Sequence, residues 1–343
     1  MTARIPLSVL DLFPVGAGNT PSRAITESLQ LARRVDDLGY SRYWIAEHHN
    51  MPSIASSSPE VLIGHVASIT RRIRVGAGGI MMPNHSPLRV VEIFRTLEAL
   101  HPGRIDLGLG RAPGTDPVTS AALRRRGSSG AEVNELLAEM LAFADGGFPD
   151  AHPFAAIQAM PSDVPLPPIW MLGSTTAGAQ IAATLGVGFS FAGHFAMREA
   201  FDAVTAYRRL FQPSERLAEP KFILAVNVVC GEDDAHAERL AAPLRLAFVR
   251  MATGRPGPIP SVEEAAAHRL SAAEEMAISR FAAGAVIGGP AKVRAGLEAL
   301  VERLGADELM ISTVTPVCAE RIASYERLAE LWMPEAATTR GAA

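Results

Sequence analysis

Short apolar runs alternate with longer amphipathic segments along the whole chain. The segment 20–39 begins with Thr20, a candidate N-cap, and with Pro21 in the first helical turn. Gly39 is a typical residue for the end of such a helix. The apolar positions between them fall on one helical face: Ile25, Leu29, Ala32 and Val35. Repeated along the chain, this alternation is typical of βαβ units and predicts a parallel sheet.

Eight apolar runs qualify as strands, and a helical segment follows each of them. The runs cover residues 5–12, 41–49, 72–80, 103–114, 167–173, 188–193, 221–231 and 307–314. A segment rich in Gly and Pro, 254–270, interrupts the repeat between the seventh and eighth pairs. We therefore predict an α/β protein built as one (β/α)8 TIM barrel, with an insertion between strand 7 and strand 8. A doubly wound sheet explains the count of pairs less well.

The composition is that of an ordinary globular enzyme. Hydrophobic residues make up 48% and charged residues 20% of the 343 residues, and the formal net charge is -4. This balance argues against a nucleic-acid binder, which would present a basic face. We assign residues 1–334 to a single barrel domain and expect 335–343 to form a disordered tail.

Targeting and redox signals are sparse. No apolar run is long enough to cross a membrane, and the first residues lack the pattern of a signal peptide. The two cysteines, Cys230 and Cys318, lie far apart and form no C-x-x-C pair. This usage favours a reduced, cytoplasmic setting without structural zinc.

The segment YWIAEHHN, 43–50, places Glu47, His48 and His49 where an apolar strand ends. In a (β/α)8 barrel, the C-terminal ends of the strands carry the active site. Successive strand residues point to opposite faces, so His48 and His49 are not expected to ligate one metal ion. We expect one imidazole to face the barrel mouth as an acid–base group. The alternatives are a structural histidine and, more distantly, a metal-dependent barrel hydrolase.

Glycines collect at the ends of the third and fourth strands. Gly76, Gly78 and Gly79 mark either a tight turn or a place where a ligand approaches the backbone. Gly110 and Arg111 follow in the run LGLGRAPG, whose glycine spacing does not match a dinucleotide-binding fingerprint. An arginine beside glycines at the barrel rim is suited to bind a phosphate. A solvated surface arginine is the alternative.

Two more features belong to the same rim. A strand leads into a helix N-terminus, where backbone N–H groups, hydroxyls and the helix dipole suit an anion, although ordinary N-capping would use the same residues. These residues are Gly173, Ser174, Thr175 and Thr176. Phe13, Phe191 and His194 are candidates for an apolar wall and a polar handle of a pocket, and the alternative is that they belong to the core.

With these motifs in order, the chain resembles the bacterial luciferase-like, flavin-dependent monooxygenases. The similarity runs from LSVLDL to the last strand. It is strongest in WIAEHHN, RVGAGGIMMPNHSPLRVVE, LHPGRIDLGLGRAPG and WMLGSTTAGAQIAATLG. The resemblance implies a (β/α)8 barrel with an insertion near the seventh strand and an FMN across the strand ends. It also implies homodimers that pack through helices of the first half.

The resemblance assigns roles to single residues. It implies that His48 is the catalytic histidine, and that Gly78 and Gly79 form a non-prolyl cis peptide under the flavin ring. Arg111 corresponds to the arginine on the flavin phosphate, and Ser174 with its neighbours corresponds to the phosphate loop.

Two departures from the family bear on function. Gly110, which we place among the cofactor-binding residues, stands where bacterial luciferase has a cysteine beside the flavin. The long mobile loop of the light-emitting subunit is not evident, so light emission is not expected. We place His49 at the substrate pocket, in a supporting role with Glu47.

The implied activity is that of a monooxygenase component in a two-component system. Reduced FMN and O2 would oxygenate a small organic substrate through a flavin C4a-hydroperoxide. Because no dinucleotide fingerprint is present, a separate flavin reductase would supply the reduced FMN as a transient partner. The alternatives are an F420-dependent dehydrogenase or reductase on the same fold, and a non-catalytic flavin-binding protein. The sequence does not specify the substrate.

Overall fold

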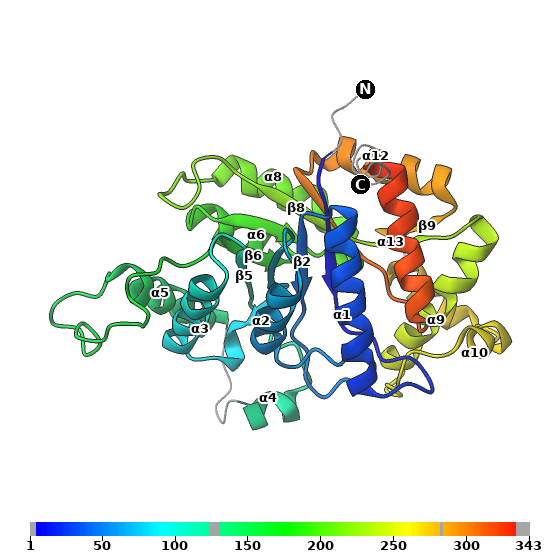
Figure 1. Ribbon diagram of the computed structural model, residues 1–343, viewed down its shortest axis with the longest axis horizontal. Coiled ribbons are helices and arrows are strands. Elements are labelled where there is room, and N and C mark those ends of the chain that lie inside the picture. The colour runs from blue at the N-terminus through cyan, green and yellow to red at the C-terminus, as the bar shows by residue number, and fades with distance from the viewer. Residues whose placement is uncertain (1–4, 124–129, 282–283, 334–343) are drawn as a thin grey trace.

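The computed structural model describes residues 5–123, 130–281 and 284–333. Its centre is a closed barrel of eight parallel strands (Figure 1). The strands are β1 (Leu7–Asp11), β2 (Arg42–Ile45), β3 (Arg74–Ala77), β5 (Ile105–Gly110), β6 (Ile169–Gly173), β7 (Gly188–Phe191), β8 (Phe222–Cys230) and β10 (Glu308–Ser312). Closure follows because β10 pairs in parallel with both β8 and β1. The predicted (β/α)8 barrel is therefore confirmed.

Helices surround the barrel (Figure 1). They are α1 (Pro21–Leu38), α2 (Pro59–Ile69), α3 (Pro87–Leu100), α5 (Gly130–Asp145), α6 (Thr176–Thr184), α8 (Ala200–Leu210), α12 (Pro290–Leu304) and α13 (Cys318–Trp332). The expected bounds of α1 are confirmed: the Thr20 side chain caps its start, and Gly39 ends it at a φ of 86°. That left-handed backbone favours glycine, which has no Cβ. Within the described ranges, no helix is long and apolar enough to cross a membrane.

The insertion lies between β8 and β10, as predicted, but it is longer than 254–270. It holds α9 (Asp234–Ala252), α10 (Val262–Ala267), α11 (Ala272–Phe281) and β9 (Val286–Gly288). Figure 1 shows α9 and α10 on the side of the barrel opposite α3 and α5. The sequence placed 234–252 in the ring of barrel helices, and this assignment is wrong. The ring position between α8 and α13 belongs to α12, whereas α9 packs on α10, α11 and β9.

Short elements at the C-terminal ends of the strands shape the barrel mouth and were not predicted. They are β4 (Ile80–Met81), η1 (Met82–Asn84), α4 (Pro117–Leu123), α7 (Gly193–Ala196) and η2 (Met197–Glu199). Each is two to seven residues long, too short for a hydrophobic period to reveal it in the sequence. The segment 335–343, expected to be a tail, lies outside the described residues.

Charged side chains fill the barrel interior at the N-terminal ends of the strands, which we call its lower end. Arg42 at the start of β2 donates from Nη1 to Asp106 Oδ2 at 2.8 Å and from Nε to Glu308 Oε1 at 3.0 Å. Arg74 adds a second pair to Asp106, from Nη2 to Oδ1 at 2.6 Å. Burial raises the pKa of Glu308 even though Arg42 opposes this shift. We call these four side chains the floor. Because they close the lower end, the open volume of the barrel lies at the C-terminal ends of its strands.

Candidate functional site

A cavity of about 300 Å³ opens at the C-terminal ends of the strands. Eight of the residues predicted from the sequence line it: His48, Gly78, Gly110, Arg111, Gly173, Ser174, Thr175 and His194. Two further predicted residues lie beside it. Gly79 packs against the backbone of Gly108, and Thr176 begins α6. The barrel therefore brings together motifs that are far apart in the sequence, at the place where such barrels carry their active sites.

Three residues predicted for the pocket lie elsewhere, and these placements are corrected. Phe13 and Phe191 are fully buried in the apolar core outside the cavity. Phe191 points outward from β7 with Phe189, whereas Ser190 between them lines the cavity. Strand alternation carries this information, because successive residues face opposite sides. His49 turns away from the cavity to bond Glu47.

The same alternation decides which residues of the histidine motif face the cavity. Trp44, Ala46 and His48, each two residues apart along β2 and its extension, all line the cavity. Glu47 and His49 occupy the intervening positions and are not among the lining residues. The expectation that the two imidazoles face different surroundings is therefore confirmed by their contacts.

One ring nitrogen of His48 is engaged in a hydrogen bond, and the other is available as a proton acceptor. Its Nδ1 lies 3.0 Å from the carbonyl oxygen of Gly114, and its backbone N–H donates to the Ser56 carbonyl at 3.1 Å. A carbonyl oxygen accepts and does not donate, so Nδ1 carries the hydrogen and Nε2 of the neutral ring is an acceptor. Burial lowers the pKa of His48, as does the nearby His49, although the Gly114 carbonyl and Glu47 oppose the shift. The ring is therefore neutral at pH 7.

Glu47 is a fully buried carboxylate that ties the histidine motif to the segment after β3. It accepts from the Met81 N–H at 2.8 Å, from Asn84 Nδ2 at 3.0 Å and from Nε2 of His85 at 2.9 Å. His49 Nε2 completes the set at 2.9 Å. Burial alone would raise the pKa of Glu47, but the hydrogen bonds from His85, Asn84 and Met81 outweigh it and lower the pKa. Glu47 thus holds the loop that carries His48 onto β4 and η1.

The peptide bond between Gly78 and Gly79 is cis, as the resemblance implied. A Cβ on Gly78 would lie 2.6 Å from Cδ1 of Leu10 and 3.1 Å from Cβ of Trp44. A Cβ on Gly79 would lie 2.8 Å from the Gly108 carbonyl oxygen. Side chains do not fit at either position. The backbone here forms a strip of cavity wall that carries no side chain.

One end of the cavity is suited to an anion. The Nε of Arg111 is buried and has no hydrogen-bond partner among the described residues. Its guanidinium reaches the first turn of α6, with Nη2 3.7 Å from a Cβ built on Gly178. Thr175 is the N-cap residue of α6, yet its side chain makes no capping bond. A positive side chain, the hydroxyls of Ser174 and Thr175 and the N-terminal end of a helix therefore meet at this point.

His194 lies in α7 and also lines the cavity. Its carbonyl oxygen accepts from Asn227 Nδ2 at 2.9 Å, which fixes the turn that carries it. Burial lowers the pKa of His194 to about 4, with a smaller contribution from His48. The imidazole is therefore neutral at pH 7.

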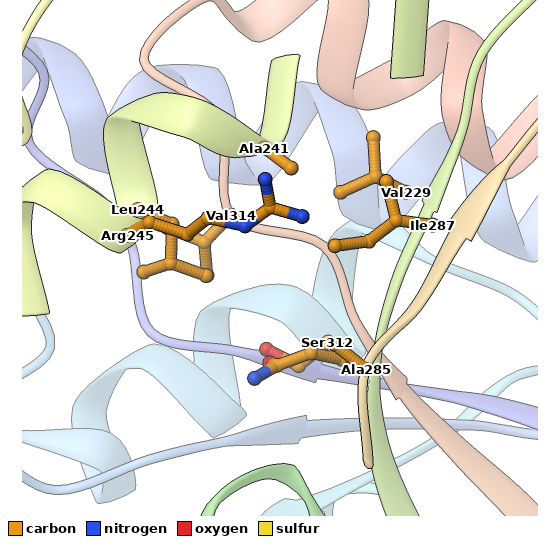
Figure 2. Close-up of a pocket in the computed structure, with 9 residues that line it drawn as sticks. Val229, Ala241, Leu244, Arg245, Ala285, Ile287, Ser312 and Val314 are labelled. Atoms are coloured by element: carbon orange, nitrogen blue, oxygen red, sulfur yellow. The ribbon is translucent and has the colours of Figure 1, made fainter. Parts of the chain in front are cut away.

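A second cavity adjoins β8 and β9 beneath α9 (Figure 2). It holds only about 20 Å³, which is enough for a water molecule and too small for an organic substrate. Figure 2 shows the Arg245 side chain extending from α9 toward Val229 and Ile287. In the described part of the chain, no group of three or more His, Cys, Asp or Glu residues could hold a metal ion.

A closed (β/α)8 barrel with a cavity at the C-terminal ends of its strands has the architecture in which barrel enzymes carry their active sites. Residues 5–308 match the family model described as luciferase-like monooxygenase. The chain belongs to the luciferase-like monooxygenase family.

Relatives and solved structures agree with this assignment. A luciferase-like monooxygenase of Escherichia coli (strain K12) is 40% identical over 311 residues, 90% of this chain and 91% of the relative. The N-acetyl-S-alkylcysteine monooxygenase of Bacillus subtilis (strain 168) is 34% identical over 328 residues, 95% of this chain and 98% of the relative. The crystal structure of apo-MsnO8 matches with a TM-score of 0.85 and 35% identity, over 95% of this chain and 98% of that one.

More distant structures share the fold and differ in cofactor. A type II Baeyer–Villiger monooxygenase in complex with FMN matches with a TM-score of 0.70 at 16% identity, over 97% of this chain and 99% of that one. An F420-dependent secondary alcohol dehydrogenase matches with a TM-score of 0.69 at 12% identity, with the same coverage of both chains. At these identities, the likeness speaks for the fold alone.

Proposed function

We propose that this protein is an FMN-dependent monooxygenase that receives reduced FMN from a separate reductase and oxygenates a small organic molecule. The observation that carries the proposal is the anion site at Arg111 and the start of α6, joined by one cavity to the neutral His48. The names of its family and of its relatives support the monooxygenase class.

The residues present fit FMN. A phosphate would give the buried Arg111 Nε the partner that it lacks, and Ser174 and Thr175 would add hydroxyl donors. The strip at Gly78 and the apolar side chains around it suit the flat face of an isoalloxazine ring. Reduced FMN, when bound, supplies the electrons that activate O2.

The chain's own residues would hold the reactants and manage a proton. His48, neutral and with Nε2 as acceptor, is placed to accept a proton inside the cavity and return it. Side chains such as Leu10, Trp44 and Leu172 keep water from the reacting centre. Gly108 and Gly110 belong to strand β5 and do not form a dinucleotide-binding fingerprint. This supports a separate reductase as the source of reduced FMN.

Titration of the purified protein with FMN and with F420 tests the cofactor. We expect FMN to bind more tightly than F420. Arg111→Ala should weaken FMN binding roughly 10- to 100-fold, the value of a charged hydrogen bond. Arg245→Ala is the matched control, because Arg245 also has a buried Nε without a partner among the described residues but lines the small second cavity. Tighter binding of F420, or equal losses in both variants, would overturn the proposal.

The reaction is tested by supplying reduced FMN and measuring oxygen uptake and oxygenated product over a panel of organic substrates. His48→Ala should lower product formation by about two orders of magnitude or more. His48→Gln, which keeps a hydrogen-bond acceptor without acid–base function, should not rescue it. Wild-type rates in His48→Ala would remove the proposed role.

A further inference from the structure

The part of the cavity lining that does not belong to the anion site is mostly apolar. Its walls are formed by Leu12, Trp44, Leu172, Phe195, Ala225 and Met310. Among the described residues that line the cavity, Arg111 is the only one with a permanent charge, and none carries a carboxylate. A ligand that fills this part therefore meets hydrocarbon on most of its surface.

His194 is, with Ser190, one of the polar side chains in this lining, and it carries an unsatisfied polar atom. Its Nδ1 is buried and has no hydrogen-bond partner within the described ranges. The ring is held edge-on against Phe195, with their centroids 4.5 Å apart, and Asn227 anchors the backbone from β8. A buried nitrogen without a partner costs stability, and a ligand group that reaches the ring would supply the missing partner.

We propose that His194 determines substrate choice by hydrogen-bonding one uncharged polar group of an otherwise apolar organic molecule. This inference rests on the proposed function, because it takes the Arg111 end of the cavity to be filled by the flavin phosphate. The substrate class is then a neutral compound with a single carbonyl, hydroxyl or similar group.

Neither a positively nor a negatively charged group on the substrate suits this cavity. An ammonium group would find neutral imidazoles and hydrocarbon and no carboxylate to pair with. A carboxylate would compete with the flavin phosphate for Arg111, the one permanent positive charge on the described lining. An acidic compound such as an N-acetyl-S-alkylcysteine should therefore be a poor substrate for this chain.

The test is a calorimetric titration with four probes that share a six-membered ring and differ in polar group. They are cyclohexanone, cyclohexane, cyclohexanecarboxylate and cyclohexylamine, each titrated into the protein with and without saturating FMN. In the FMN-loaded protein, we expect cyclohexanone to bind most tightly, about fivefold more tightly than cyclohexane, as one hydrogen bond predicts. Removing FMN should restore binding of the carboxylate through Arg111 and leave the preference for the ketone over cyclohexane.

Variants separate the hydrogen bond from packing. His194→Phe should abolish the preference for cyclohexanone over cyclohexane, and His194→Gln should keep most of it. His65→Phe, the same change at an exposed position of α2, should behave as wild type. FMN affinity should be unchanged in all three. If His194→Phe does not fold, His194→Leu serves in its place.

The outcomes are distinct. Tightest binding of the carboxylate or the amine in the FMN-loaded protein would overturn the inference, as would a ketone preference that survives His194→Phe. Failure of the wild-type protein to bind FMN would overturn the proposed function. The titrations without FMN would still decide whether His194 recognises the neutral polar group.

Discussion

The two ends of the barrel interior treat their ionisable side chains in opposite ways. On the floor, Arg42 and Arg74 pair with Asp106, and Arg42 also pairs with Glu308, so each charge has an opposite charge within hydrogen-bonding distance. At the mouth, Arg111 Nε and His194 Nδ1 are buried without a partner in the described structure.

Polar side chains that are paired within the chain contribute to stability, whereas unpaired ones are available to a ligand. Buried polar groups in folded proteins are normally hydrogen-bonded, so the floor meets the requirement within the chain itself. The mouth leaves two donors or acceptors unpaired along one cavity, which a ligand can satisfy. Changes at the floor should therefore alter stability, and changes at the mouth should alter ligand binding.

The largest expected effect is at the floor. Asp106→Asn removes the charge that pairs with Arg42 and Arg74 and keeps the shape of the side chain. Breaking one side of a buried ion pair typically costs about 3–5 kcal/mol, and here Arg74 would lose its carboxylate partner while Arg42 keeps Glu308. Urea unfolding followed by circular dichroism measures the loss.

Asp145→Asn is the control for this change, because Asp145 pairs with Arg216 at the surface. A surface pair contributes little, so the unfolding midpoint should stay near that of the wild type. Equal losses in the two variants would show that the floor is not the stabilising element inferred here.

Much of this fold follows from the sequence because strand and helix periods are local. Alternation along 43–49 separates Trp44, Ala46 and His48 from Glu47 and His49 without knowledge of the fold. The ring position of α12 could not be assigned in the same way, because α9 has an equally good helical pattern. Only packing against α8 and α13 decides between them.

The site was less predictable because its details depend on contacts between distant segments. The role of Glu47 requires Asn84 and His85, which η1 and the residue after it bring to the carboxylate. The missing partner of Arg111 Nε is a property of the folded surroundings that no motif records. For Phe191 the pocket prediction is wrong, and its alternation with Ser190 along β7 already points it outward.

A second effect, of up to about 3 kcal/mol, concerns acid stability at the mouth. The pKa of His194 falls from its usual 6.5 to about 4 on folding because the ring is buried. Between these values the unfolded chain binds a proton that the folded protein does not, so stability decreases as pH falls through this window. His194→Gln should lose less stability between pH 7 and pH 4 than the wild type, measured by urea unfolding. Parallel losses in the two proteins would contradict the neutral, buried state of the ring.

The smallest expected effect compares two threonines at helix starts. Thr20 caps α1, since its Oγ1 accepts from the Arg23 N–H at 3.3 Å, whereas Thr175 at the start of α6 makes no such bond. Thr20→Ala should cost about 1 kcal/mol of unfolding free energy and leave FMN affinity unchanged. Thr175→Ala should cost less stability and weaken FMN binding, because its hydroxyl is unused within the helix and lines the cavity. The unfolding free energy and the FMN affinity are measured for Thr20→Ala and for Thr175→Ala. If Thr175→Ala instead destabilised the fold and left FMN affinity intact, the unpaired groups at the mouth would not mark a ligand site.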